Sequence, residues 1–144
     1  MIIDSMVSEK IYNALQDEIS QIIFNARMLY CINRDGREMF NLTNRLYPNK
    51  KEYFDISIKI CVYGAGMGAR WPVRILQLLY GEIPFIIDNK KRGRYRNIPI
   101  ITFEEFLKRS DFRDYEIFVS VGENYFDEVS QLLAKEQLNF KLWY

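Results

Sequence analysis

The stretch KICVYGAGMGARWPVRILQLLYG, residues 59–81, decides the fold. An apolar run at its start is followed by Gly64, Gly66 and Gly68, and an amphipathic pattern then continues to the end of the stretch. This order predicts a buried strand, a tight turn poor in side chains and a helix. Because backbone N–H groups at the start of a helix can receive a phosphate, the turn is the first candidate for a nucleotide site.

Composition excludes several classes of function. The chain has 144 residues, and 20 Lys+Arg against 19 Asp+Glu leave a net charge of +1, so we expect no nucleic-acid partner. The sequence contains no histidine, which excludes Ser-His-Asp and Cys-His nucleophiles. Cys31 and Cys61 form neither a zinc motif nor a disulfide framework, and we expect no metal site. With no leader pattern and no long apolar segment, the sequence predicts a cytoplasmic protein without membrane insertion.

The first 55 residues predict a helical hairpin. Ser8 suits the N-cap of a first helix, in which apolar residues recur at three- and four-residue steps from Ile11 to Tyr30. The turn-forming residues 33–36 end this helix, and a second helix is expected at 37–46. Because the first helix has one apolar stripe, we expect it either to cover the sheet or to form a homodimer.

Residues 56–144 form the second predicted domain, in which short apolar strands alternate with helices. We expect strands at 57–63, 83–88, 98–101, 116–121 and 138–143, and helices at 69–80, 103–108 and 124–136. Strands that are apolar on both faces belong to a mainly parallel sheet covered by helices. The sequence therefore predicts a doubly wound α/β domain with five strands in the order 3-2-1-4-5, preceded by the helical hairpin of residues 1–55.

The glycine turn fits a dinucleotide-binding pattern. Gly64, Gly66 and Ala69 form G-x-G-x-x-A, where the first glycine makes the turn, the second admits a pyrophosphate and the third position stays small for packing. Asp88 ends the next predicted strand, 24 residues after Gly64, where an acid bonds ribose hydroxyls. Including the loop after the strand at 116–121, the candidate site residues are Gly64, Ala65, Gly66, Met67, Gly68, Asp88, Asn89, Ser120 and Val121.

Other interpretations of the turn stay open. Gly64 and Gly66 serve equally well to turn the chain in a fold that binds nothing small. Pro72 requires the helix to begin only a few residues earlier, and Trp71 near the mouth of the turn is more typical of packing than of ligand contact. The glycines also fit the G-x-G-x-G of S-adenosylmethionine enzymes, although Val62 stands where those enzymes usually carry an acid.

The sequence predicts no catalytic residues. Tyr47 and Lys51 have the Tyr-x-x-x-Lys spacing of short-chain dehydrogenases, but Pro48 between them breaks the helix that this spacing requires. Lys90 and Arg92 follow the second predicted strand in a basic loop, which suits either a phosphate or solvent. The candidate site is therefore a binding site rather than a reaction centre.

Four strings in the second domain resemble a known family. VYGAGMGA, FIIDNKKRG, NIPIITFEEF and DYEIFVSVGENYFDEVSQLL are similar to the small Rossmann-like domain of bacterial surface-polysaccharide biosynthesis, over residues 57–144. That domain is the N-terminal part of sugar O- and N-acetyltransferases of the sialic acid and bacillosamine type, and a similar one accompanies FkbM-type methyltransferases and nucleotide-sugar dehydratases. Asn97 departs from its pattern, which has glycine there. In the acetyltransferases the glycine turn and the acid after the second strand contact the nucleotide of a nucleotide-linked sugar, which implies this role for Gly64, Gly66 and Asp88.

The turn and the resemblance together lead to one expectation. The chain is expected to be a nucleotide- or nucleotide-sugar-binding module, an accessory or fragment of a sugar-modifying enzyme, with a UDP-sugar or NAD(P) as ligand and no catalysis of its own. It contains no left-handed β-helix repeat, catalytic histidine or methyltransferase domain. The alternatives are an NAD(P)-linked oxidoreductase or dehydratase fragment, an S-adenosylmethionine-related accessory domain, and an interaction domain without a small ligand.

Overall fold

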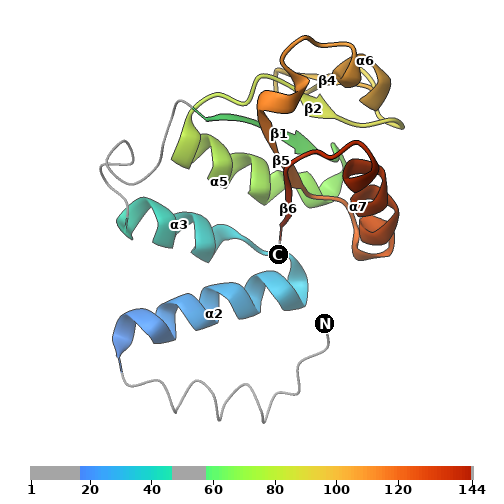
Figure 1. Cartoon of the computed structure of the whole chain (residues 1–144). Coiled ribbons are helices and arrows are strands. Elements are labelled where there is room, and N and C mark those ends of the chain that lie inside the picture. Colours follow the sequence, from blue (N-terminus) through green and yellow to red (C-terminus); the bar gives the residue numbers. More distant parts are fainter. Residues whose placement is uncertain (1–16, 47–57, 144) are drawn as a thin grey trace. The chain divides into compact units, whose positions relative to one another are not determined.

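The computed structural model of the chain (Figure 1) describes residues 17–46 and 58–143. The chain divides into two compact units, Met1–Pro48 with Tyr144 and Asn49–Trp143. The predicted start of the first helix at Ser8 and the Tyr-x-x-x-Lys spacing lie outside the described residues.

In the described part of the first unit, the helices α2 (Glu18–Asn33) and α3 (Arg37–Leu46) lie side by side (Figure 1). Asp17 caps α2, since its carboxylate accepts hydrogen bonds from the Ser20 N–H and the Ser20 hydroxyl, both at 2.7 Å. Arg34 ends this helix in the left-handed conformation, with φ 56°. The two helices therefore lie where the hairpin is predicted. The first begins at Glu18, because Asp17 is extended (φ −117°, ψ 147°) and caps it, whereas the sequence predicts one helix through Ile11 to Tyr30.

The second unit is built on a six-stranded sheet in the order β3-β4-β2-β1-β5-β6. Its strands are β1 (Lys59–Tyr63), β2 (Ile86–Ile87), β3 (Arg94–Tyr95), β4 (Ile98–Ile101), β5 (Tyr115–Val119) and β6 (Phe140–Leu142). Neighbouring strands are parallel except for β3 and β4, which are antiparallel. The predicted α/β class with a mainly parallel sheet is confirmed.

The predicted strand count and order need correction, because β3 adds a sixth strand at the edge of the sheet. Arg96 and Asn97 both have positive φ, 48° and 68°, and the turn that they form folds β3 back onto β4. Without β3 the sheet reads β4-β2-β1-β5-β6. The strand predicted at 83–88 shrinks to β2, because Pro84 has no N–H to offer a neighbouring strand. The strand predicted at 98–101 is confirmed as β4, and the other predicted boundaries in this domain differ by at most two residues.

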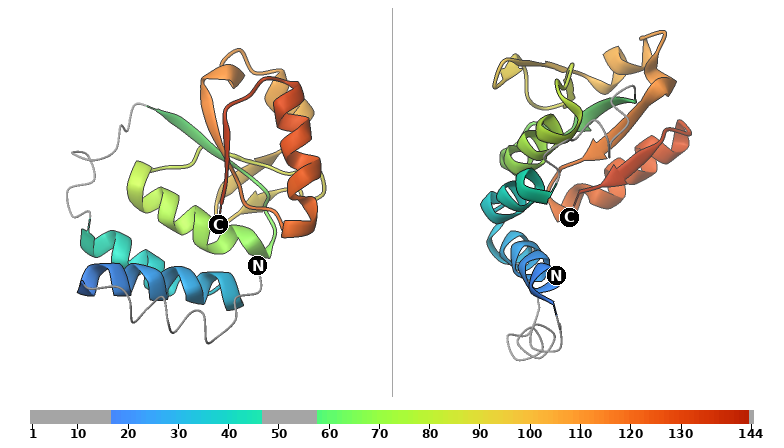
Figure 2. Two further views of the ribbon diagram at one scale, coloured as in Figure 1. Left: turned by 60° about the horizontal axis from the view of Figure 1, so that its bottom comes forward. Right: turned by 90° about the vertical axis from the view of Figure 1, so that its left-hand side faces the viewer.

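Helices cover both faces of the sheet, as the right-hand view of Figure 2 shows. On one face lies α5 (Arg70–Tyr80), and on the other lie α6 (Phe103–Leu107) and α7 (Phe126–Lys135). Residues 58–143 also include three 3-10 turns: η1 (Met67–Ala69), η2 (Phe112–Asp114) and η3 (Glu123–Tyr125). Because η1 leads from the glycine turn into α5, the α-helix begins late, and Pro72 falls in its first turn, where its missing N–H breaks no helical hydrogen bond.

The core forms two apolar layers, one on each face of the sheet. Val62 of β1 and Leu76 of α5 belong to the first layer, and Ile117 of β5, Phe106 of α6 and Leu133 of α7 belong to the second. All five side chains are at most 1% exposed. Consecutive residues of β1 and β5 point into opposite layers, which explains why these strands are apolar without alternation.

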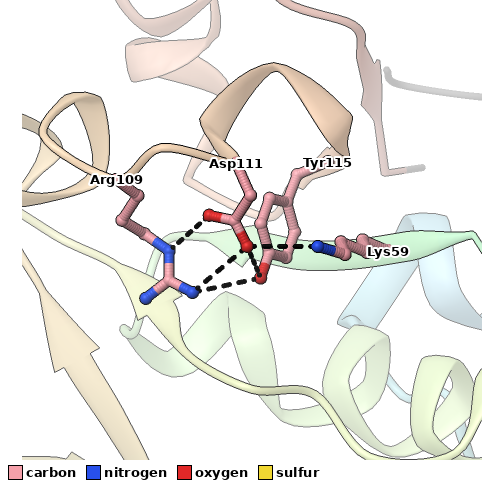
Figure 3. A network of polar contacts seen from close by, with 4 residues as sticks. All are labelled: Lys59, Arg109, Asp111 and Tyr115. Atoms are coloured by element: carbon pink, nitrogen blue, oxygen red, sulfur yellow. Dashed lines mark hydrogen bonds and ion pairs between the residues drawn. The ribbon is translucent and has the colours of Figure 1, made fainter.

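A polar network fastens the amino ends of β1 and β5 (Figure 3). The Asp111 carboxylate accepts hydrogen bonds from Arg109 Nε at 3.1 Å, Lys59 Nζ at 3.2 Å and the Tyr115 hydroxyl at 3.3 Å. Lys59 and Tyr115 are the first residues of their strands and are paired in register. The network therefore holds the edge of the sheet opposite the glycine turn.

Acid should weaken the second unit through Asp111. Hydrogen bonds from Arg109 and Lys59 hold the pKa of Asp111 below its usual value. The pKa of Asp111 is higher in the unfolded chain, at about 4, so this stabilisation is complete above about pH 4 and is lost as the pH falls through the folded value. We expect urea-unfolding midpoints to fall more steeply between about pH 6 and pH 3 in the wild type than in Asp111→Asn. The exposed Asp114→Asn is the control, and equal slopes for all three proteins would contradict the prediction.

Candidate functional site

The three glycines of the turn between β1 and α5 meet different requirements. Gly64 has φ +111°, and a Cβ there would lie 2.9 Å from Val121 Cγ1. A Cβ at Gly68 would lie 2.7 Å from the Ser120 carbonyl oxygen. Gly66 has φ −82°, which any residue adopts, and a Cβ there would meet nothing within 4 Å. The fold therefore requires glycine at positions 64 and 68, but not at position 66.

Ser120 holds the turn from the side of β5. Its side chain is buried, and the hydroxyl oxygen lies 3.1 Å from the Gly64 carbonyl oxygen and 3.3 Å from that of Tyr63. The Ser120 N–H also donates to the Tyr63 carbonyl at 2.9 Å. Ser120 is thus a neighbour of the predicted site that shapes the turn, and its hydroxyl is already used within the chain.

Asp88 holds the turn from the side of β2. One carboxylate oxygen accepts the Ala65 N–H at 2.8 Å, and the other accepts the N–H groups of Lys90 at 2.7 Å and Lys91 at 2.8 Å. Burial raises the pKa of Asp88, but these three hydrogen bonds outweigh it, and the pKa lies below its usual value. An ionised carboxylate has about four acceptor positions, so one remains for a ligand hydroxyl.

The nine predicted candidate residues are brought together at one edge of the sheet. They follow β1, β2 and β5, three neighbouring parallel strands whose carboxyl ends meet. Asn89 contributes to the fold there, because its side-chain oxygen accepts the Phe103 N–H at 2.9 Å, at the start of α6. The structure therefore places the nine predicted residues together, and several of their side chains hold the loops in place.

The open side of the turn presents unpaired donors. Ala69 N–H bonds the Gly66 carbonyl at 3.1 Å, which closes the first turn of η1. Among the residues that the structure describes, none accepts a hydrogen bond from the N–H groups of Gly66, Met67 or Gly68. The Met67 side chain is 97% exposed. Three adjacent N–H groups are therefore available where a 3-10 helix and α5 begin.

The start of α5 also differs in charge from the other described helices. α2, α3, α6 and α7 each carry an acid in the first turn, whereas α5 and η1 carry none. Acids at this position compensate the positive end of the helix dipole. In α5 that end stays uncompensated by its own side chains, which favours an external anion.

Trp71 does not fill this space. Trp71 is 8% exposed, and its ring centroid lies 5.2 Å from Arg70 Cζ and 5.0 Å from Arg74 Cζ. Apart from Gly66 and its two chain neighbours, no described residue has an atom within 4 Å of a Cβ placed at Gly66. Trp71 is therefore a packing residue, as its place in the sequence predicts, and the turn keeps an open side.

One contact at this edge was missed by the sequence analysis. Lys90 Nζ lies 4.5 Å from the centroid of the Tyr125 ring. Tyr125 ends η3, in the connection from β5 to α7, and connections that leave the carboxyl ends of such strands border the ligand crevice. This position is the signal that could have placed Tyr125 among the candidates.

Other chemistry is sparse in residues 17–46 and 58–143. No group of three or more His, Cys, Asp or Glu side chains in these ranges is arranged to hold a metal ion. Both cysteines are free, and burial raises the pKa of the Cys61 thiol, which makes it a poor nucleophile. None of the helices in these ranges combines the length and the apolar character that crossing a bilayer requires.

Comparisons with known proteins leave the family open. No family model matches the chain, and no curated protein or solved structure matches it either. The resemblance to the Rossmann-like domain of sugar acetyltransferases therefore stays an expectation that rests on the sequence motifs.

Two alanine substitutions test the geometry of the turn. Gly68→Ala places a Cβ against the Ser120 carbonyl, and we expect it to lower the free energy of unfolding by about 1–3 kcal/mol. Gly66→Ala, in the same turn but facing open space, should change it by less than about 0.5 kcal/mol. Urea unfolding of both variants measures the difference, and equal losses would show that the turn is packed differently.

Asp88→Asn should destabilise the second unit. An asparagine offers one oxygen in place of two, so its NH2 group must face one of the N–H donors of Ala65, Lys90 or Lys91, and we expect a loss of about 1–3 kcal/mol. Because the pKa of Asp88 is lowered on folding, this stabilisation should be present above about pH 4 and fade below it. Thermal melts at neutral and acid pH check both points. Glu82→Gln, an exposed change before β2, is the control and should have little effect at either pH.

Proposed function

We propose that the glycine turn binds the phosphates of a nucleoside diphosphate or of a nucleotide-linked sugar, and that the chain contributes binding rather than catalysis. The observation that carries the proposal is Gly66. The fold does not require a glycine there, because a Cβ at this position would meet nothing within 4 Å beyond its chain neighbours, and the N–H groups of Met67 and Gly68, which follow it in the chain, donate to no acceptor among the described residues. A ligand that approaches these donors closely is a reason for glycine at this position.

The distribution of charge supports one orientation of the ligand. Phosphates suit the start of α5, which has no acid in its first turn, better than the start of α7, where Asp127 and Glu128 would repel them. Asp88 is ionised and has one free acceptor position, so it suits a hydroxyl donor such as a ribose and not a second anion. We therefore place the phosphates at the N–H groups of residues 66–68 and the ribose toward Asp88.

The sugar part of the proposal rests on the sequence resemblance alone. The geometry of the turn suits the diphosphate of a UDP-sugar and that of NAD(P) equally well. A role in surface-polysaccharide synthesis and a homodimer through the N-terminal helices rest on the resemblance and on the helix pattern in the same way. The proposal of binding without catalysis is supported by the residue types at the site, since the chain has no histidine.

Thermal denaturation in the presence of ligands tests the proposal. UDP, UDP-N-acetylglucosamine, NAD, NADP and S-adenosylmethionine are compared with uridine, which has no phosphate. A ligand at about 100 times its dissociation constant adds roughly 2.7 kcal/mol of stability. We expect UDP and UDP-N-acetylglucosamine to raise the melting temperature and uridine to raise it far less.

Gly66→Asp is the variant that separates binding from folding. At the N-cap of η1 an aspartate side chain can accept the Gly68 N–H, so the stability of the unliganded protein should be unchanged or slightly raised. Its negative charge would occupy the phosphate position, and the shift with UDP should disappear. If UDP raises the melting temperature of this variant as much as that of the wild type, the phosphates do not bind at the turn. If no nucleotide shifts the wild type, the interaction domain becomes the better interpretation.

A further inference from the structure

Lys90 and Tyr125 meet across the end of β1. Lys90 follows β2, Tyr125 lies in the connection after β5, and these two strands pair with β1 on opposite sides. Their contact, with Nζ 4.5 Å from the ring centroid, therefore spans the carboxyl end of β1 beside the glycine turn. A ligand that lies on the turn and extends toward the loop after β2 comes close to this pair.

The backbone of Lys90 is held relative to the turn by Asp88, whereas its side chain is exposed. The Lys90 N–H and the Ala65 N–H bond opposite oxygens of the same Asp88 carboxylate. The long side chain is exposed, and within the described parts of the chain its ammonium pairs with no carboxylate. Its contact is the Tyr125 ring, which is itself 42% exposed. The positive charge of Lys90 therefore lies within reach of the site without being neutralised.

Residues 89–97, which include Lys90, form a local concentration of positive charge. They contain Lys90, Lys91, Arg92, Arg94 and Arg96 and no acid, so the rest of the chain is net negative (+1 minus +5 gives −4). Arginines on and beside the edge strand β3 have a structural explanation, because charges on an edge discourage pairing with another sheet. That explanation does not apply to Lys90, which precedes the strand and contacts Tyr125.

We propose that Lys90 is a phosphate-binding side chain. Its ammonium contacts the Tyr125 ring in the unliganded protein and exchanges that contact for a phosphate when the ligand binds. The inference rests on the proposed function and names the ligand group that Lys90 binds, a phosphate held at the glycine turn. A charge-assisted hydrogen bond to phosphate is stronger than an exposed cation–π contact, so the exchange is favourable. Tyr125 holds the Lys90 ammonium beside the site in the unliganded protein and so competes weakly with the ligand.

The first test compares neighbouring lysines by calorimetric titration of the full chain with UDP. Lys90→Met keeps the apolar stem and removes the charge, and we expect UDP to bind about tenfold more weakly. Lys91→Met is the charge-matched control, because the Lys91 N–H bonds the same Asp88 oxygen, whereas its ammonium contacts no ring among the described residues and its charge acts on Asp88 at the proposed ribose position. We expect this variant to change the affinity less than about twofold. Lys90→Arg should retain most of the affinity. Binding of uridine should be the same in all four proteins.

The second test asks whether Tyr125 acts through Lys90. Tyr125→Leu removes the competing contact and should raise the affinity for UDP about two- to fivefold, while Tyr125→Phe keeps the ring and should leave it unchanged. In the Lys90→Met background Tyr125→Leu should have no effect, because the side chain that it releases is absent. A merely structural role of Tyr125 would act equally in both backgrounds.

The outcomes separate this inference from the proposed function. If the wild type does not bind UDP, both fail. If the wild type binds UDP, Gly66→Asp abolishes binding and Lys90→Met behaves like Lys91→Met, only the role of Lys90 is overturned. If Tyr125→Leu changes the affinity equally in both backgrounds, the ring is not a resting place for Lys90, and the proposed exchange is wrong.

Discussion

The Asp88 carboxylate is the contact on which the geometry of the candidate site depends. It accepts N–H groups from two separate segments, Ala65 in the glycine turn and Lys90 and Lys91 in the basic loop, and so fixes one relative to the other. Hydrogen bonds to an ionised acceptor are stronger than those between neutral groups, which is why one side chain suffices. Ser120 supports the turn from the opposite strand, so the open side at Gly66 is formed before any ligand arrives.

The residues of a binding motif can be required by the fold, by the ligand or by both. In this turn Gly64 and Gly68 are explained by close approach of the loop after β5, whereas no contact with the described residues explains Gly66. Asp88 is shared, since three of its acceptor positions hold loops and one is free. A glycine or an acid in such a motif therefore supports ligand binding only where the fold itself does not require that residue. Gly66, with the N–H groups beside it, meets this condition here.

The fold was largely predictable where hydrophobic pattern decides it. β1 and β5 appear in the sequence as apolar runs because both of their faces are buried. Gly64 marks the end of β1, and Gly81 marks the end of α5. β3 was missed because a two-residue strand shows no period and Arg96-Asn97 is not a usual hairpin turn sequence. The length of β2 was overestimated because apolar residues around Pro84 resemble a strand, while pairing depends on available N–H groups.

The sequence by itself determined where a site could form, because parallel strands that alternate with helices bring their carboxyl ends to one edge. It also determined that the turn at Gly64 to Gly68 is poor in side chains. Only the tertiary structure decided which donors stay unpaired, that Asp88 bonds Ala65, and that Lys90 rests on Tyr125. These facts depend on distances between segments far apart in the chain, which hydrophobic period and local turn chemistry do not specify.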